Sequence, residues 1–365
     1  NVTAGGKEVP KNGSETSSGG SGTVTPPSGG SSEPAKVTIT GVSITGNAVV
    51  GSILTAVPSP EEATVTYQWM ISDTEDDGYS NIAGATTNTY TLDAGDLGKF
   101  IKVVATGTGN YTGSVTSIAT VVKGAAQIGT THYLSLHEAV NEAIDGDTIK
   151  LTADVTLSDT IKVDKTITLD LNGHTLRTGL AEIISVGSNV GGTGIKNCNL
   201  TIKDSGQTGT ITTTDPSAIS YSPSVSVNYG TLTIEGGTFT GNYSEAPVAV
   251  MSNGQNPTAV INGGTFENTN DDNFSFAVSS LSESLIINSG TFNAASGRAI
   301  QIRSNGVSFP AATVTINGGV INGNVFLFDM YWGDKDWVGD DRVTATINGG
   351  TLNGGFKSYG YGTFI

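Results

Sequence analysis

Apolar and polar residues alternate in short runs along the second half of the chain, as in Thr231-Leu-Thr-Ile234 and Thr313-Val-Thr-Ile316. This period of two is typical of strands that are buried on one face. Each run ends in a short motif: an apolar residue, usually Asn, then Gly-Gly-Thr and another apolar residue. The motif begins at Ile234, Ile261, Ile287, Ile316 and Ile347, with weaker copies at Leu171 and Ile202. Recurrence at 26 to 32 residues predicts a stacked repeat.

Each repeat consists of a strand, a bend and a second strand, and no segment between the repeats has the pattern of a helix of about ten residues. The Gly pair permits a sharp bend with positive φ. We therefore predict a parallel β-helix of about seven coils spaced about 4.8 Å apart, right-handed because crossover connections between parallel strands almost always are. One internal column is predicted to hold the first apolar residue of every motif: Leu171, Ile202, Ile234, Ile261, Ile287, Ile316 and Ile347. A second is predicted to hold Phe239, Phe266 and Phe292.

Asparagine recurs at the bend, at positions 172, 262, 288, 317 and 348. Asparagine tolerates a left-handed backbone, and its amide can bond the equivalent amides of the coils above and below. Lys203 and Glu235 interrupt the series, so we predict a structural ladder that is continuous only over the last four coils.

The open ends of a stack need covers. Ser135 and Glu138 have the spacing of a capping box, and the apolar face that follows predicts a helix over 135–144. His137 lies on the polar side of this helix and is predicted to be solvated. At the other end, the aromatic residues of 359–365 either fold over the last coil or leave it open.

Upstream, residues 37–123 contain short strands separated by Gly, Asp and Asn turns, which predicts a β-sandwich with Trp69 in its core. There is no Cys pair, and Phe100 stands where a hydroxyl-bearing Tyr would form the corner. Residues 1–36 are rich in Gly, Ser, Thr and Pro and are predicted to be a disordered linker. The predicted organisation is linker 1–36, sandwich 37–123 and β-helix 124–365.

Two resemblances follow from these segments. The stretch Tyr133-Leu-Ser-Leu-His-Glu-Ala-Val140, with Asp145-Gly-Asp-Thr-Ile149 and Ile167-Thr-Leu-Asp-Leu-Asn-Gly-His-Thr-Leu176, resembles the opening of pectate-lyase-like right-handed β-helix domains of bacterial surface proteins. Tyr67-Gln-Trp69 and the strand around Phe100 resemble bacterial immunoglobulin-like modules, which usually act as spacers. The first family includes adhesins, lyases and hydrolases, so the resemblance implies a fold and leaves the activity open. It also implies that His174 is structural.

Composition narrows the partners. The formal charge of −16 makes binding to nucleic acid or to an anionic membrane unfavourable. The only cysteine, Cys198, lies in an alternating run and is predicted to be buried. The chain contains no transmembrane run, and we expect no direct membrane insertion; an anchor attached upstream of Asn1 would hold the protein at the surface.

The longest departure from the repeat, residues 326–341, is one candidate binding site. It combines aromatic rings, which can stack on sugars, with acids, which can accept hydroxyl protons. The candidate ligand-binding residues are Tyr331, Trp332, Asp334, Asp336 and Trp337. A calcium ion is the alternative ligand, held by Asp334, Asp336, Asp340 and Asp341, although the spacing does not fit an EF-hand. The competing interpretation is a packed loop that only covers the flank of the coils.

The second candidate comes from the repeat itself. Glu245, Asp272 and Arg298 lie 11 residues after successive motif Ile residues, with Asp271 adjacent. If the register holds, they form a column along one flank, where a lyase or a hydrolase could place carboxylates and a base. A solvated ladder of acid, acid and base explains the same residues without catalysis.

The sequence therefore predicts an all-β, secreted or cell-surface bacterial protein that resembles an adhesin. Its expected partners are extracellular glycans or components of a host or neighbouring cell surface, with no cofactor except possible calcium. We expect binding without catalysis. The alternative is a polysaccharide lyase or glycoside hydrolase acting on an acidic polymer, which the low content of Arg makes less favourable.

Overall fold

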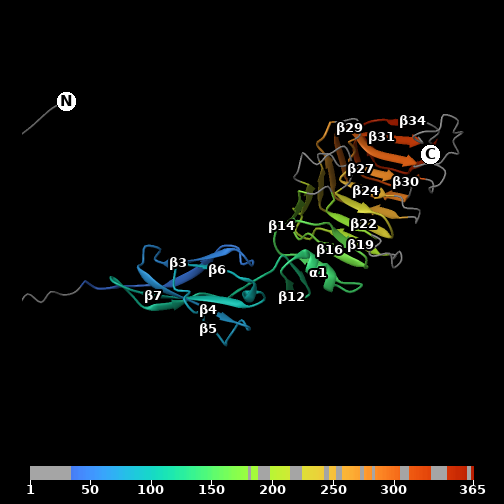
Figure 1. The fold of residues 1–365 in the computed structure, drawn as a ribbon. Coiled ribbons are helices and arrows are strands. Elements are labelled where there is room, and N and C mark those ends of the chain that lie inside the picture. The colour runs from blue at the N-terminus through green and yellow to red at the C-terminus, as the bar shows by residue number, and fades with distance from the viewer. Residues whose placement is uncertain are drawn as a thin grey trace, which may run out of the picture.

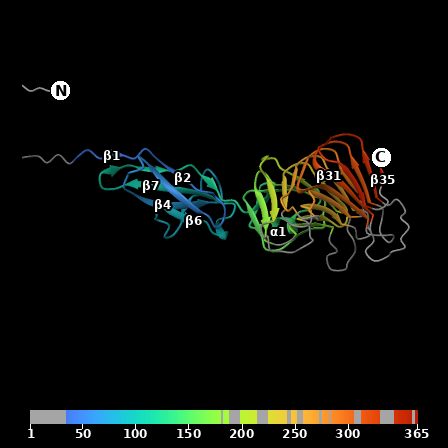
Figure 2. The same cartoon turned by 90° about the horizontal axis from the view of Figure 1, so that it is seen from above.

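The computed structural model describes residues 34–179, 182–187, 198–213, 224–241, 246–251, 257–271, 275–281, 284–304, 312–329, 343–359 and 363–365. Strands dominate, and the described residues contain one short α-helix. Figures 1 and 2 show two parts in tandem: antiparallel sheets nearer the N-terminus and long, curled parallel sheets nearer the C-terminus. We call these the antiparallel region and the parallel region.

The antiparallel region has a five-stranded and a three-stranded sheet, together with a parallel pair of short strands. The larger sheet contains, in order, β10 (Thr120–Val121), β7 (Phe100–Gly107), β4 (Val65–Ser72) and β5 (Ser80–Asn81), with β9 (Ser114–Thr116) also on β7. The smaller contains β2 (Gly41–Thr45), β3 (Ile53–Ser59) and β6 (Thr89–Thr91). The pair is β1 (Val37–Thr38) with β8 (Tyr111–Thr112).

Trp69 is fully buried in the core of the antiparallel region, as predicted. Its ring lies 5.7 Å from that of Tyr90, and its indole N–H donates to the carbonyl oxygen of Thr87 at 2.9 Å. The Tyr90 hydroxyl donates to Asp96 Oδ2 at 2.9 Å, beside the 3₁₀ helix η1 (Ala94–Asp96). A tyrosine therefore does tie a strand to a turn here, but at position 90 and not at the position of Phe100.

The parallel region begins with the predicted helix. α1 (Leu136–Glu142) starts at Ser135, whose hydroxyl accepts a hydrogen bond from the Glu138 amide at 3.1 Å. Glu138 accepts in turn from the Leu134 amide at 3.0 Å, one residue before the expected partner. Leu136, Ala139 and Val140 bury the apolar face of the helix against the first strands.

Two long sheets follow. The described strands of the first form an 11-stranded sheet. Their order is β12 (Thr131–Tyr133), β11 (Ala126–Ile128), β13 (Thr148–Leu151), β16 (Ile167–Asp170), β19 (Asn199–Lys203), β22 (Thr231–Ile234), β25 (Thr258–Ile261), β28 (Ser284–Ile287), β30 (Ala312–Ile316), β32 (Val343–Ile347) and β35 (Thr363–Phe364). From β13 onward every pairing is parallel.

The second sheet has 14 described strands. One half contains β14 (Val155–Leu157), β17 (Thr175–Thr178), β20 (Thr210–Thr213), β23 (Thr238–Gly241) and β26 (Thr265–Asn268). The other contains β15 (Ile161–Val163), β18 (Ile184–Val186), β21 (Val225–Val227), β24 (Val248–Met251) and β27 (Val278–Leu281). The halves meet at β29 (Thr291–Ser304), which is followed by β31 (Val320–Asp329), β33 (Thr351–Leu352) and β34 (Phe356–Tyr359). Because each strand pairs with the equivalent strand about one repeat later, the arrangement is consistent with a parallel β-helix.

The predicted internal columns are present with one correction. Phe239, Phe266 and Phe292 stack with ring centroids 5.0 and 4.9 Å apart. The isoleucine column runs as predicted from Ile202, but it continues to Leu169 and not to Leu171. Leu171 is buried at the bend itself, because the weak first copy of the motif begins two residues after Leu169, just beyond the end of β16.

The predicted asparagine ladder is confirmed over the last four coils. Asn288 donates to Asn262 at 2.8 Å, Asn317 to Asn288 at 2.8 Å, and Asn348 to Asn317 at 2.7 Å. Asn172 alone adopts positive φ and donates instead to a backbone carbonyl. In the last five copies the glycine just before the Thr or Val of the motif takes the positive φ, as at Gly264, where a Cβ would lie 2.9 Å from the oxygen of Gly237.

Candidate functional site

One row of strands is bordered by both of the stretches that the sequence proposed as binding sites. It consists of β18, β21, β24, β27, the end of β29 and β31, which pair in parallel. Their Val and Ile side chains enter the core, so the residues between them lie on the opposite face of the sheet. We call these residues the serine row: Ser185, Ser226, Ala249, Ser279, Gln301 and Phe326.

The serine row is buried although it lies outside the core. Ser226 is 2% exposed, Ser279 0% and Gln301 4%. The Ser279 hydroxyl donates to Gln301 Oε1 at 2.8 Å. Buried polar groups are costly without partners, and these side chains supply partners for one another.

A second polar cluster lies two or three coils before Ser279 in the same row. Asn228 donates to the hydroxyl of Ser185 at 2.9 Å and to that of Ser226 at 3.0 Å. Ser226 donates to a carboxylate oxygen of Glu182. Sequence reasoning missed both clusters, because a single serine within an alternating run has no distinguishing pattern.

The predicted aromatic and acidic residues lie outside the described residues; they are Tyr331, Trp332, Asp334, Asp336, Trp337, Asp340 and Asp341. The sequence predicted that the chain departs from the repeat at Phe326. That starting point is wrong. Phe326 belongs to β31 and is buried, so the strand continues to Asp329. The next described residue is Val343, at the start of β32. The candidate stretch therefore follows the last residue of β31, where Asp329 pairs with Ser304.

The predicted flank column cannot be followed through the described residues. Glu245 and Asp272 lie outside them, whereas Asp271 is described and exposed. Counted from the paired residues Gly241, Asn268 and Ala294, the three candidate positions are each four residues on (245 − 241, 272 − 268, 298 − 294). Counted back from the next paired set, Val248, Val278 and Ile300, they are three, six and two residues away (248 − 245, 278 − 272, 300 − 298). Unequal connections mean that equal spacing in sequence does not establish a column.

Arg298 is held by an aromatic ring. Its guanidinium carbon lies 4.9 Å from the centre of the Phe326 ring, within the range of a cation–π interaction. Phe326 in turn packs edge-on against Phe276 at 6.0 Å, in a small cluster with Ala246. In the backbone register Arg298 pairs with Asn324. Arg298 therefore lies against Phe326, a residue of the serine row.

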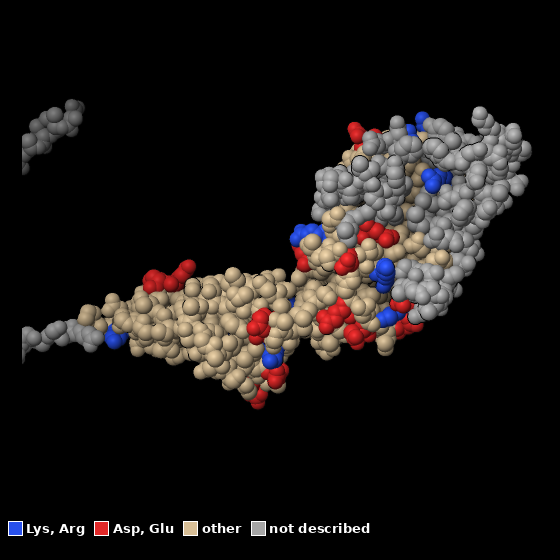
Figure 3. Space-filling model, in the orientation of Figure 1, with Lys and Arg blue, Asp and Glu red and all other residues tan. Residues whose placement is uncertain are grey.

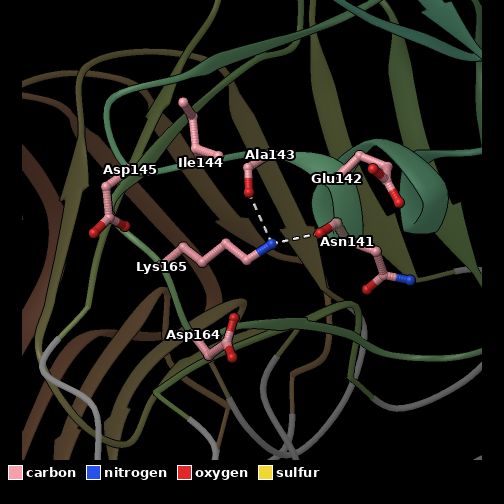
Figure 4. A pocket seen from close by; sticks show the side chains of 7 residues that line it. All are labelled: Asn141, Glu142, Ala143, Ile144, Asp145, Asp164 and Lys165. Carbon is pink, nitrogen blue, oxygen red and sulfur yellow. Dashed lines mark hydrogen bonds between the residues drawn. The ribbon is translucent and has the colours of Figure 1, made fainter.

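A hollow with a volume of about 670 Å³ lies beside α1, and Figure 4 shows it. Lys165 Nζ donates to the carbonyl oxygens of Val140, Asn141 and Ala143 at 3.0, 2.5 and 2.8 Å. A cation at the carbonyl end of a helix is electrostatically favourable, so Lys165 has a structural role. The hollow is lined by Asn141, Glu142, Ala143, Ile144, Asp145, Asp164 and Lys165.

The structure also places His137, His174 and Cys198. His137 is partly buried, contrary to the predicted solvated position, and its Nε2 is buried without a partner among the described residues. His174 Nδ1 lies 3.6 Å from Asp154. Cys198 is buried, as predicted; its thiol donates to the Val163 carbonyl at 3.3 Å, and burial raises its pKa.

Within the described ranges, no group of three or more His, Cys, Asp or Glu residues is placed to hold a metal ion. No helix there is long and apolar enough to span a membrane. Comparison of the chain with protein-family models, with curated proteins and with solved structures finds no match.

Proposed function

We propose that this is a non-catalytic, adhesin-like protein, secreted by a bacterium or attached to its surface. In this proposal it binds extracellular glycans beside the serine row. In this proposal the parallel region is a right-handed β-helix of about seven coils, and the antiparallel region is an immunoglobulin-like spacer that holds it away from its point of attachment. The expected partner is a glycan, or another component of a host or neighbouring cell surface.

One observation carries the proposal. The aromatic and acidic stretch follows the end of β31, and the connections containing Glu245 and Asp271 lead into β24 and β27. Both stretches thus border the same row of strands, from opposite ends. Irregular connections on a repeat scaffold often carry binding, and this topology lets two of them contribute to one surface.

Charge supports binding over catalysis on an acidic polymer. The chain has a formal charge of −16, and an acidic polysaccharide would need added cations to approach it. Arg298, the base that the enzymatic alternative would use, lies against Phe326.

The test is a glycan array probed with the full chain, with and without EDTA. We expect Trp332→Ala combined with Trp337→Ala to weaken binding at least about tenfold, equivalent to about 1.4 kcal/mol, because both stacking rings are lost. Loss of binding in EDTA would assign Asp334, Asp336, Asp340 and Asp341 to calcium.

Tyr79→Ala in the antiparallel region is the matched control, since it removes an aromatic ring far along the chain from the proposed site. Unchanged binding by the double Trp variant would contradict the proposal. So would an unsaturated or reducing-end product that disappears in Arg298→Ala or Asp272→Ala.

A further inference from the structure

The outer face of the 11-stranded sheet carries two rows made mostly of small hydroxyl side chains. In the first row, consecutive strands pair Asn199, Thr231, Thr258, Ser284, Thr313 and Thr344. In the second they pair Thr148, Thr168, Thr201, Thr233, Val260, Ile286, Thr315 and Thr346. We call this surface the threonine face. Its rows are about 6.6 Å apart, since they lie two residues apart on each strand.

The threonine face is open and uncharged. Its residues are exposed or partly exposed, and neither row contains an acid or a base. Among the described residues, the Thr and Ser hydroxyls of the two rows take no hydrogen-bond partner from the protein. Figure 3 shows charged side chains scattered over the visible surface of the molecule. Within the described part of the sheet, exposed or partly exposed charges lie beside the second row only in the first coils, at Lys150, Lys203 and Glu235. The later coils, bordered by the ladder asparagines, offer an uncharged surface in a chain of −16, which favours a neutral ligand.

The face is also braced from within the coils. In the second sheet, Phe239, Phe266 and Phe292 stack through the core with ring centroids 5.0 and 4.9 Å apart. The asparagine ladder borders the second row and ties four coils together. Threonine itself has few side-chain rotamers to lose on binding.

A single exposed hydroxyl contributes little, because water already satisfies it. Only a rigid ligand with a matching repeat can use many hydroxyls at once. A pyranose unit linked through opposite ends of its ring advances a chain by roughly 5 Å, given bonds of about 1.5 Å. That step is close to the strand spacing of about 4.8 Å. Val260 and Ile286 add an apolar patch that suits the C–H face of a sugar ring.

We propose that the threonine face docks on the surface of an ordered, neutral polysaccharide whose chains run along the stacking direction of the coils. This inference rests on the proposed function only in taking a glycan as the ligand. It places the contact on a different face from the serine row, and it needs neither tryptophan.

The experiment is sedimentation of the full chain with two insoluble neutral probes, microcrystalline cellulose and chitin. We expect the parent protein to bind at least one of them. Thr233→Lys with Thr315→Lys should lower the bound amount at least about fivefold, because two bulky charges interrupt the second row and prevent simultaneous contacts. The matched control is Thr238→Lys with Thr291→Lys, which places the same charges on the other sheet, one in the coil of Thr233 and one in the coil before that of Thr315. Thermal unfolding of both variants shows whether each is folded.

The control variant should bind like the parent. A parent that binds neither polymer overturns the inference, and so does a control variant that loses as much binding as the test variant. If soluble glycans on the array still bind in a manner that depends on Trp332 and Trp337, this inference fails while the proposed function stands. If the protein binds the polymers but no glycan on the array, this inference stands and the proposed function fails.

Discussion

At the scale of single residues, burial changes the protonation of His132. It lies in β12, opposite Gln127 of β11, and its Nδ1 is buried without a partner in the described structure. Burial lowers its pKa below the usual 6.5, and the nearby charge of Lys123 lowers it further. Both effects disfavour the protonated form in the folded state only.

This pKa shift predicts a pH dependence of stability. Below about pH 6.5, His132 binds a proton in the unfolded chain but stays neutral in the folded protein. The free energy of unfolding therefore falls as the pH falls through this window. The loss stops below the folded-state pKa. Chemical denaturation between pH 5 and 7 measures it, and His132→Gln should flatten the slope. His174→Gln, which keeps His132, should leave that slope unchanged. If the free energy of unfolding of the parent protein does not change over this pH range, the prediction is contradicted.

At the scale of elements, the bends of the parallel region depend on the asparagine ladder. Asn317 takes part in two ladder bonds, one as donor to Asn288 and one as acceptor from Asn348. A hydrogen bond typically contributes about 0.5–1.5 kcal/mol to stability. Asn317→Ala should therefore lower the free energy of unfolding by about 1–2 kcal/mol.

Asn353→Ala is the matched control for the ladder. Asn353 ends a second row of amides, and its side chain makes one ladder bond there, to Asn322 at 2.7 Å. Removing it should cost about half as much as removing Asn317. Equal losses in urea unfolding of the two variants would mean that the ladder bonds are not the cause.

The elements also show what the sequence could predict. Strand positions, the bend and α1 follow from local patterns: period-two alternation, Gly-Gly pairs and the Ser135–Glu138 spacing. The position of Leu171 was misjudged because register depends on the pairing of neighbouring strands, which a weak motif copy does not reveal. The serine row was missed for a related reason. Its burial results from which residues the folded chain places around it, and this is not a property of any single strand.

At the scale of the whole molecule, the two regions have separate cores. One cluster of buried residues extends through the parallel region and another through the antiparallel region. Only four residues, 122–125, lie between β10 and β11. Val122 belongs to the core of the antiparallel region, and Ala125 packs against the core of the parallel region. Separate cores predict that each region can lose its packing without the other.

The change that tests this is Trp69→Ala. Trp69 is fully buried, and truncation of a core aromatic residue to Ala typically costs about 3–5 kcal/mol. We expect calorimetry of the parent to show two transitions, of which only one moves to lower temperature in the variant. Hydrogen exchange should then show faster exchange in β4 and β7, which pair along their whole lengths, while β22, β25 and β28 stay protected. Phe266→Ala, in the middle of the ring stack of the parallel region, is the reciprocal control and should move the other transition. A single transition that shifts in both variants would show that the two cores unfold as one cooperative unit, with the short connection transmitting the loss of packing between them.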